Sequence, residues 1–229
     1  GLGDVYKRQL YFPLLMQQVV TPRLARTLSV SHASAAEIER YFGIPAKRVE
    51  VVYNGTDTEI FRPMERPKET DLIFVGRTED RKKGIPFLLE ALARTEKNIT
   101  LKIVDGRIPP NGLVPQKIRA LGLGDRVVLL ERMLSVPELV AEYSTARVAL
   151  APSFFEGFGF PASEAMACGL PVIATSSGAL PEVVGTSGEA GLLVPFGDAE
   201  ALAKAIHELA GDPERSARMG RAARHRIER

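Results

Sequence analysis

Short, wholly apolar segments recur along this chain after residue 70, and longer helix-forming stretches separate them. Leu72-Ile73-Phe74-Val75 and Val148-Ala149-Leu150-Ala151 are apolar at every position rather than at every second one. A strand of this kind is buried on both faces, as in a parallel sheet that helices cover on both sides. The repeated strand–helix units therefore predict an α/β, Rossmann-like, doubly wound parallel sheet with right-handed crossovers.

The pattern predicts six strands and six helices in this region. Gly122-Leu123-Gly124 follows a helix rather than a strand and has no third glycine, so it is not a dinucleotide fingerprint. The strands are expected at 71–76, 99–104, 126–131, 147–152, 171–174 and 191–194, and the helices at 84–95, 114–121, 136–144, 161–168, 198–210 and 213–227.

An earlier part of the chain predicts a separate, smaller unit. Strands are expected at 27–31 and 49–53, with a helix over 35–42 between them. Ser34 is the expected N-cap of that helix, and Gly43 is its expected end.

Composition excludes several classes of protein. The 229 residues are 45% hydrophobic and 25% charged, which indicates a globular protein of one or two domains. A net charge of +2 is too small to indicate nucleic-acid binding. The single cysteine, Cys168, excludes an internal disulfide and fits a core position. No apolar run has the length of a membrane span and no signal peptide is recognisable, so the cytoplasm is the default location.

A polar loop with glycines lies between the strand 147–152 and the helix 161–168. Open α/β sheets bind ligands at this end of their strands, and a helix N-terminus attracts anions. Gly157 and Gly159 allow close approach of a ligand, while Glu156 and Glu164 can accept hydrogen bonds from hydroxyls. Glycines for a phosphate and carboxylates for hydroxyls suggest a sugar joined to a nucleotide diphosphate, although each feature alone is also common in loops that bind nothing.

Basic residues follow the first strand of the predicted sheet. Gly76-Arg77 ends that strand, and Lys82-Lys83-Gly84 precedes the next helix. An arginine fork and a lysine point charge at a strand–helix junction suit a diphosphate. The alternative is a solvated basic loop, which is the preferred interpretation for Arg81 and Lys82.

Two segments together resemble a known family. Glu156 and Glu164 are eight residues apart, Gly157-Phe158-Gly159 follows the first, and 165–172 follows the second with the sequence AMACGLPV. This resembles the E-x7-E segment of retaining glycosyltransferases of the GT4 type, which have the two-domain GT-B fold. Arg77 with Lys83 resembles the G-R-x5-K-G element of that family, and Lys82 remains an alternative to Lys83.

The resemblance implies roles for individual residues. Arg77 and Lys83 would stabilise the departing diphosphate, Glu156 would place the sugar, and Glu164 would hold the ribose hydroxyls, so Arg77, Lys83 and Glu156 are the expected catalytic residues. Backbone groups near Met133 would contact the base. No metal site and no cofactor are implied, and the chain contains no Asp-x-Asp motif. The substrate-binding residues implied are Gly76, Met133, Gly157, Phe158, Gly159, Phe160 and Glu164.

The resemblance also implies a domain division. Residues 1–9 look non-native, residues 10–62 look like the remnant of an N-terminal acceptor domain, and 63–70 is a linker rich in proline and charge. Residues 71–229 would be the donor-binding domain, truncated at its end. The chain would then be the donor-binding half of an enzyme, inactive alone, that transfers a sugar from a nucleotide-sugar donor.

Other functions remain open at this point. A nucleotide-sugar epimerase or phosphorylase of GT-B fold and a binding module without turnover are the alternatives, while the missing fingerprint argues against a nicotinamide-dependent enzyme. The expected acceptor is a carbohydrate or a lipid-linked molecule. Arginines recur at near-helical spacing in 213–229. A solvated face is preferred for them over a surface for anionic lipid, and the latter would give peripheral attachment at the inner membrane face.

Overall fold

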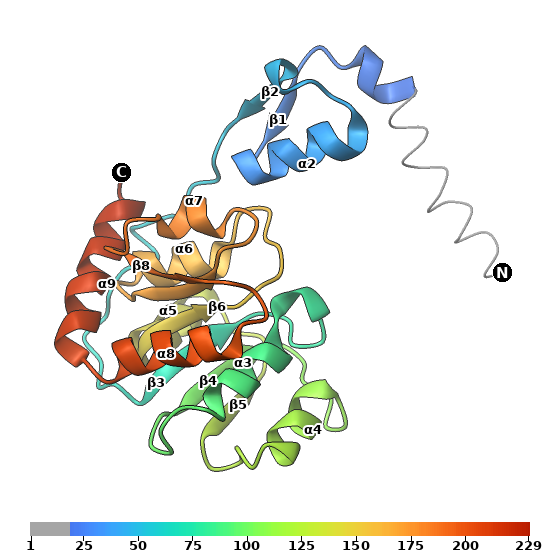
Figure 1. The fold of residues 1–229 in the computed structure, drawn as a ribbon. Coiled ribbons are helices and arrows are strands. Elements are labelled where there is room, and N and C mark those ends of the chain that lie inside the picture. Colours follow the sequence, from blue (N-terminus) through green and yellow to red (C-terminus); the bar gives the residue numbers. More distant parts are fainter. Residues whose placement is uncertain (1–18) are drawn as a thin grey trace. The chain divides into compact units, whose positions relative to one another are not determined.

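The computed structural model describes residues 19–229, which divide into two compact units (Figure 1). The division falls between Asn54 and Gly55, so the segment 63–70 lies within the second unit. The expectations for residues 1–9 and for 10–18 fall outside the described range.

The first unit contains a strand–helix–strand arrangement. Strand β1 (Thr27–Ser29) pairs in parallel with β2 (Val49–Val51), and α2 (His32–Phe42) connects them. The N-cap of α2 is Ser31 rather than the expected Ser34, because the Ser31 side chain accepts the N–H of Ser34 at 3.0 Å. The two short 3₁₀ helices are η2 (Thr21–Arg23) and η3 (Ala46–Arg48).

The second unit is built on a six-stranded sheet in which every pair of neighbours is parallel. The order is β5-β4-β3-β6-β7-β8, so the expected doubly wound parallel sheet is confirmed. Each expected strand lies within two residues of its observed bounds. The strands are β3 (Thr70–Val75), β4 (Leu101–Asp105), β5 (Val127–Glu131), β6 (Ala146–Ala151), β7 (Val172–Thr175) and β8 (Gly191–Val194).

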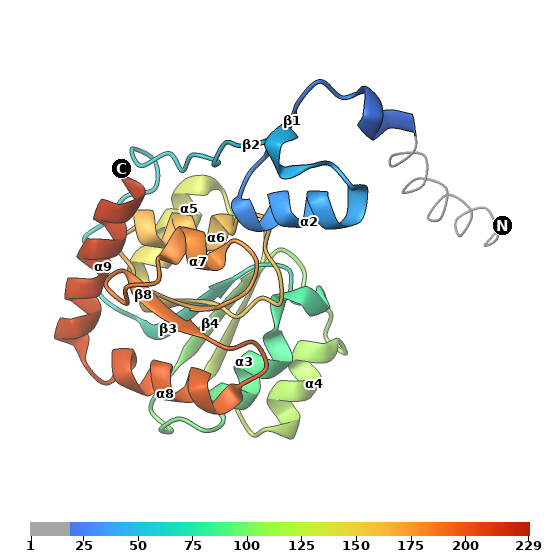
Figure 2. The same cartoon turned by 45° about the horizontal axis from the view of Figure 1, so that its top comes forward.

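Helices cover both faces of this sheet, as Figures 1 and 2 show. Leu72 and Phe74 of β3 join the apolar cluster beneath α3, α4 and α8, and Ile73 joins the opposite cluster beneath α5, α6 and α7. Helix α9 contributes to both clusters through Met219 and Ala223. The helices are α3 (Ile85–Leu92), α4 (Leu113–Ala120), α5 (Val136–Thr145), α6 (Phe160–Ala167), α7 (Leu180–Val184), α8 (Ala199–Ala210) and α9 (Pro213–Ile227), with the 3₁₀ helix η4 (Arg81–Lys83) before α3.

The strand order reverses between β3 and β6, and the loops after these two strands are joined. The N–H of Phe154 donates to the carbonyl of Lys82 at 2.7 Å. Gly84 has a φ of +69°, and a Cβ there would overlap the carbonyl oxygen of Pro152. This reversal is the place where open α/β sheets bind ligands. The backbone itself therefore brings the loop with Lys83 next to the loop with Glu156.

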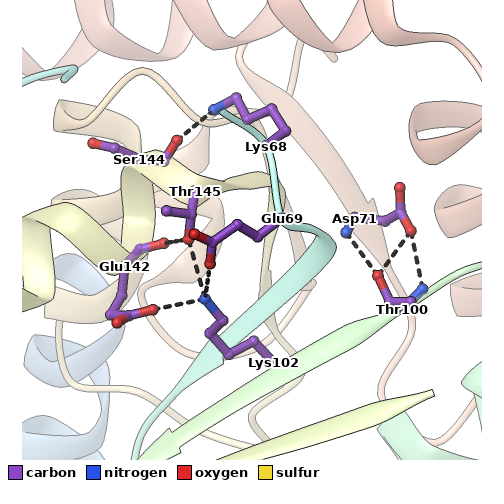
Figure 3. A network of polar contacts seen from close by, with 8 residues as sticks. All are labelled: Lys68, Glu69, Asp71, Thr100, Lys102, Glu142, Ser144 and Thr145. Atoms are coloured by element: carbon purple, nitrogen blue, oxygen red, sulfur yellow. Dashed lines mark hydrogen bonds and ion pairs between the residues drawn. The ribbon is translucent and has the colours of Figure 1, made fainter. Parts of the chain in front are cut away.

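A buried lysine connects three elements near the amino ends of the strands (Figure 3). The Lys102 side chain is 8% exposed, and its Nζ lies 2.7 Å from Glu142 Oε2 and 3.1 Å from Glu69 Oε2. It also donates to Thr145 Oγ1 at 3.2 Å. Burial lowers the pKa of Lys102, but the hydrogen bonds and charges of the two carboxylates outweigh burial and raise the pKa overall. The network joins β4 to α5 and to the start of β3.

No helix within residues 19–229 is both long enough and apolar enough to cross a membrane.

Candidate functional site

An ion pair and a hydroxyl hold the carboxylate of Glu156 at the point where the strand order reverses. Lys83 Nζ lies 2.7 Å from Glu156 Oε1, and the two side chains are 20% and 17% exposed. Ser153 Oγ donates to the same oxygen at 2.7 Å. Ser153 is buried, so its hydroxyl sets the direction of the carboxylate from inside the protein. The other carboxylate oxygen, Oε2, has no hydrogen bond within the described part of the chain.

The loop that carries Glu156 is held from two neighbouring elements. The Thr175 hydroxyl, at the end of β7, donates to the Ser153 carbonyl. The N–H of Ala179, just before α7, donates to the Glu156 carbonyl at 2.9 Å. Gly178 has a φ of +56°, and a Cβ there would lie 2.5 Å from the Glu156 carbonyl oxygen. Only a glycine allows this close approach of the two backbones.

The basic loop after β3 separates into two parts. Gly76 lies beside Lys83, because a Cβ on Gly76 would be 3.9 Å from Lys83 Cδ. Arg77 is exposed and lines a hollow of about 580 Å³ together with Asp105 and Arg107. The buried carboxylate of Asp105 fixes this loop, since its Oδ2 accepts the Thr78 N–H at 2.6 Å and the Thr78 hydroxyl at 2.8 Å.

Helix α6 starts directly after Gly159, whose φ is +101°. The N–H groups of Ala162 and Ser163 donate to the Gly159 carbonyl, and Pro161 has no N–H. Among the described residues, the N–H of Phe160 has no partner, so it is the donor that the first turn offers to an anion. The rings of Phe158 and Phe160 meet edge to face with their centroids 5.2 Å apart.

Glu164 lies one turn inside α6 and is half-buried. Burial raises the pKa of its carboxyl, and a hydrogen bond from the Tyr143 hydroxyl at 3.2 Å opposes that rise. Burial and the neighbouring carboxylate together raise the pKa of Tyr143 well above its usual value, so the phenol stays protonated and donates. The pair holds a partly desolvated carboxylate in a fixed position.

Met133 lies in the loop after β5, in the half of the sheet that consists of β5, β4 and β3. Its side chain is 82% exposed. Gly106, which follows β4, packs against it so closely that a Cβ on Gly106 would overlap Met133 Sδ. The loops after β4 and β5 are thus side by side.

The structure brings together Lys83, Gly76 and Glu156 of the predicted site residues. Arg77 follows Gly76 directly but lines the hollow beside Asp105, and Met133 lies in the loop after β5. Sequence reasoning missed Ser153, Thr175 and Tyr143, which hold the two glutamates. Ser153 had one signal, a hydroxyl three residues before a carboxylate in the same loop. No pattern in the sequence indicated Thr175 or Tyr143. Thr175 lies 19 residues from Glu156 and Tyr143 lies 21 residues from Glu164, and only the fold brings each pair together.

Two family models match the chain. One is described as "Glycosyl transferases group 1" and matches residues 69–212, which is more than half of the chain. The other is described as "Glycosyltransferase Family 4" and matches residues 4–60.

Curated relatives match along most of the chain. The MMP alpha-(1->4)-mannosyltransferase of Mycolicibacterium hassiacum is 37% identical over 96% of this chain and 53% of its own length. The D-inositol 3-phosphate glycosyltransferase of Thermobifida fusca is 34% identical over 87% of this chain and 50% of its own length. The chain thus spans about half the length of these relatives.

Solved structures of similar fold include other glycosyltransferases. Sucrose-phosphate synthase from Thermosynechococcus elongatus is 29% identical, with a TM-score of 0.81 over 97% of this chain and 57% of that one. The Anabaena protein HepE in complex with UDP-glucose is 25% identical, with a TM-score of 0.78 over 89% of this chain and 59% of that one. These neighbours have the GT-B fold, so the expected fold class is confirmed. Because the first family model matches more than half of the chain, the chain belongs to the glycosyl transferases group 1 family.

Proposed function

We propose that this chain is the donor-binding half of a retaining glycosyltransferase that transfers a sugar from a nucleotide-diphosphate sugar to an acceptor hydroxyl. The observation that carries the proposal is the contact of Lys83 Nζ with Glu156 Oε1 at 2.7 Å, at the carboxyl ends of the strands where their order reverses. A cation for phosphate and a carboxylate for sugar hydroxyls meet there on loops that the backbone holds together.

Each residue has a role in the proposed reaction. The bond from the anomeric carbon to the diphosphate breaks, and positive charge from Lys83 and Arg77 stabilises the leaving diphosphate. Glu156 accepts hydrogen bonds from the sugar hydroxyls through Oε2, and Glu164 accepts them from the ribose. The new bond to the acceptor oxygen forms on the same face of the sugar, and the acceptor's proton passes to the diphosphate.

The charge for this chemistry comes from the protein, so the proposed reaction is independent of metal. Lys83 contacts Glu156, and Arg77 lies earlier in the same connection between β3 and α3, where a change of side-chain rotamer turns it toward the diphosphate. We expect donor binding to be unchanged when EDTA is added. A loss of binding that Mg²⁺ or Mn²⁺ restores would contradict this part of the proposal.

The comparisons support a choice of substrates to test. The printed names of relatives describe a mannosyltransferase and glycosyltransferases of D-inositol 3-phosphate, and HepE was solved with UDP-glucose. We propose a hexosyl donor carried on UDP, GDP or ADP, and a carbohydrate or lipid-linked acceptor. A cytoplasmic enzyme, attached peripherally to the inner face of a membrane where the acceptor is lipid-linked, would meet both substrates.

One observation favours a second reading of the isolated chain. Because the chain spans about half the length of its relatives, it can bind a donor without turning it over. A nucleotide-sugar binding unit without turnover is therefore the alternative for the 229 residues on their own.

A thermal-shift panel of UDP-, GDP- and ADP-sugars tests donor binding. A ligand at one hundred times its Kd stabilises a protein by about 2.7 kcal/mol, which corresponds to a rise in Tm of about 5 to 10 °C for a chain of this size. We expect one nucleotide class to give that rise and NAD to give none. No rise with any donor, in a chain that melts cooperatively, would contradict the proposal. Addition of the missing N-terminal half together with a radiolabelled donor then separates transfer from binding alone.

A further inference from the structure

A second cavity, of about 400 Å³, lies at the edge of the sheet opposite to the proposed donor site. Its walls come from the amino ends of β6 and β7, the end of α6, the outer side of α9 and the segment before β3. The proposed donor site lies at the carboxyl ends of the strands. The volume is within the range of pockets that bind small molecules.

Four cations line this cavity and no carboxylate does, among the residues that the structure describes. Two of the four have an acid as a partner just outside the cavity. Arg147 makes a 3.5 Å ion pair with Asp71, and Arg224 Nε lies 2.5 Å from Glu228 Oε1. The two cations without a paired acid are Lys68 and Arg221.

Helix capping explains part of this charge but not all of it. Lys68 donates to the carbonyls of Ser144, in the last turn of α5, and Ala146, just beyond it. Arg224 donates to the carbonyl of Ala167, the last residue of α6. Such cations stabilise helix ends. Arg221 has no hydrogen bond or ion pair within the described residues, and Arg147 has only its long ion pair. These two guanidinium groups are available to a ligand.

The cavity carries an excess of positive potential. Burial lowers the pKa of Lys68, and repulsion by the charge of Arg147 lowers it further. An anion between these side chains would relieve that repulsion. Burial, with Glu164 nearby, raises the pKa of the Cys168 thiol to about 12, so this residue lines the cavity as a neutral group and supplies no counter-charge.

The remaining walls are neutral and closely packed. Pro63, Met64 and Pro171 line the cavity beside the arginines. A Cβ on Gly220 would overlap the carbonyl oxygen of Gly169, so α9 packs directly on the turn after α6 and that wall cannot collapse inward easily. A ligand that matches these walls has a compact anionic group and a small apolar or neutral body.

We propose that this cavity is a binding site for a phosphate monoester, with the phosphate between Arg147 and Arg221 and the organic part against Pro63 and Met64. A phosphate monoester carries a charge of about −1.5 to −2 at neutral pH, which matches the charge of the two guanidinium groups that make no hydrogen bond within the described residues. Arginine binds phosphate oxygens in a forked geometry that favours this group over chloride. The site is separate from the donor diphosphate and stands independently of the proposed transfer reaction.

Calorimetric titration at fixed ionic strength tests the site with inorganic phosphate and glycerol 3-phosphate as probes. We expect Arg221→Glu to weaken binding of both by about tenfold or more, the effect of losing a charge-assisted hydrogen bond. Arg218→Glu is the matched control, because Arg218 is on the same helix, is exposed and does not line the cavity. It changes the net charge equally, and we expect a change of less than about twofold.

Lys83→Ala separates this site from the donor site, where phosphate can also bind. We expect Lys83→Ala to leave glycerol 3-phosphate binding unchanged, and Arg221→Gln to reproduce the loss if Arg221→Glu fails to give a wild-type melting curve. Equal effects of Arg221→Glu and Arg218→Glu, a loss in Lys83→Ala alone, or no binding of any probe would overturn the proposal.

Sedimentation with phosphatidylcholine vesicles, with and without phosphatidic acid, identifies the source of the phosphate. Binding to phosphatidic acid alone that Arg221→Glu abolishes makes it a lipid headgroup.

Discussion

Glu164 is a residue whose position costs stability in the absence of a ligand. Its folded-state pKa is raised because burial disfavours the carboxylate, so the folded chain binds this proton more tightly than the unfolded chain does. The stability that protonated Glu164 gives to the folded chain is fully present below the unfolded-state pKa. It is lost as pH rises through the raised folded-state pKa.

We therefore predict that Glu164→Gln makes the ligand-free chain more stable than wild type near neutral pH. The difference should vanish in acid, below the unfolded-state pKa of about 4.3, where both side chains are neutral. Urea unfolding at two pH values measures this. Tyr143→Phe is the matched comparison, because it removes the hydroxyl that stabilises the carboxylate and should lower stability at neutral pH. A Glu164→Gln chain that is less stable than wild type at neutral pH would contradict the assignment.

Ser153 is the residue that we predict to position Glu156. Loss of its hydroxyl in Ser153→Ala frees Glu156 to turn, while Lys83 keeps its charge for the diphosphate. We expect the sugar donor to bind several-fold more weakly and the bare nucleotide diphosphate to bind as before, since one neutral-to-charged hydrogen bond is worth about 1.5–3 kcal/mol at most. Ser216→Ala, which also removes one buried hydroxyl but far along the chain on α9, is the control. If both variants bind the two ligands alike, Ser153 is only structural.

At the scale of elements, the approach of the loop after β7 to the Glu156 loop depends on Gly178. A Cβ there would lie 2.5 Å and 2.7 Å from the carbonyl oxygen and the nitrogen of Glu156, which are backbone atoms that cannot turn aside. Gly122 has a similar φ of +64° with nothing within 4 Å of a Cβ. A comparison of alanine at these two positions therefore separates the cost of the left-handed backbone conformation from the cost of the clash with the Glu156 backbone.

We predict that Gly178→Ala and Gly122→Ala both lose about 1–2 kcal/mol from left-handed backbone strain, and that Gly178→Ala alone loses more and binds the sugar donor poorly. Denaturant unfolding and donor titration on the two variants measure this. Equal losses of stability with unchanged donor binding would show that the Glu156 loop does not depend on this contact.

The order of elements was predictable from the sequence because strands buried on both faces are apolar throughout. Leu72 and Phe74 lie in one core and Ile73 lies in the other, as a strand buried on both faces requires. Caps were less predictable, since Ser31 and Ser34 are both good caps and only the extended backbone of Ser31 decides between them. Lys102 gave no signal, because its partners Glu69 and Glu142 lie 33 and 40 residues away in the sequence.

The site was predictable as a set of loops but not as a set of contacts. Glu156 and Lys83 lie at the ends of strands that the pattern places in one sheet. The distance between them follows from the strand order, which the pattern alone does not give. Arg77 is two residues beyond β3, where a site residue is expected, yet it is exposed and lines the hollow beside Asp105. A side chain's direction after a strand depends on the loop's hydrogen bonds, here those of Thr78 with Asp105.

At the scale of the whole second unit, the proposed function assigns the nucleotide and the sugar to different carboxylates. Glu164 lies one turn inside α6, and from there we expect it to accept hydrogen bonds from the ribose hydroxyls. Glu156 lies on the loop itself beside Lys83, and we expect the sugar rather than the nucleotide to reach it. We therefore expect a nucleotide diphosphate to reach Glu164 but not Glu156, and the full donor to reach both.

Calorimetric titration of Glu156→Gln and Glu164→Gln with a nucleotide diphosphate and with its sugar donor tests this arrangement most directly. We predict that Glu164→Gln weakens binding of both ligands alike, by about tenfold or more for a lost charged hydrogen bond. We predict that Glu156→Gln leaves binding of the nucleotide diphosphate unchanged and weakens only that of the sugar donor. Equal losses for both ligands in both variants would contradict it, and would mean that the two glutamates support the loop without contacting the donor.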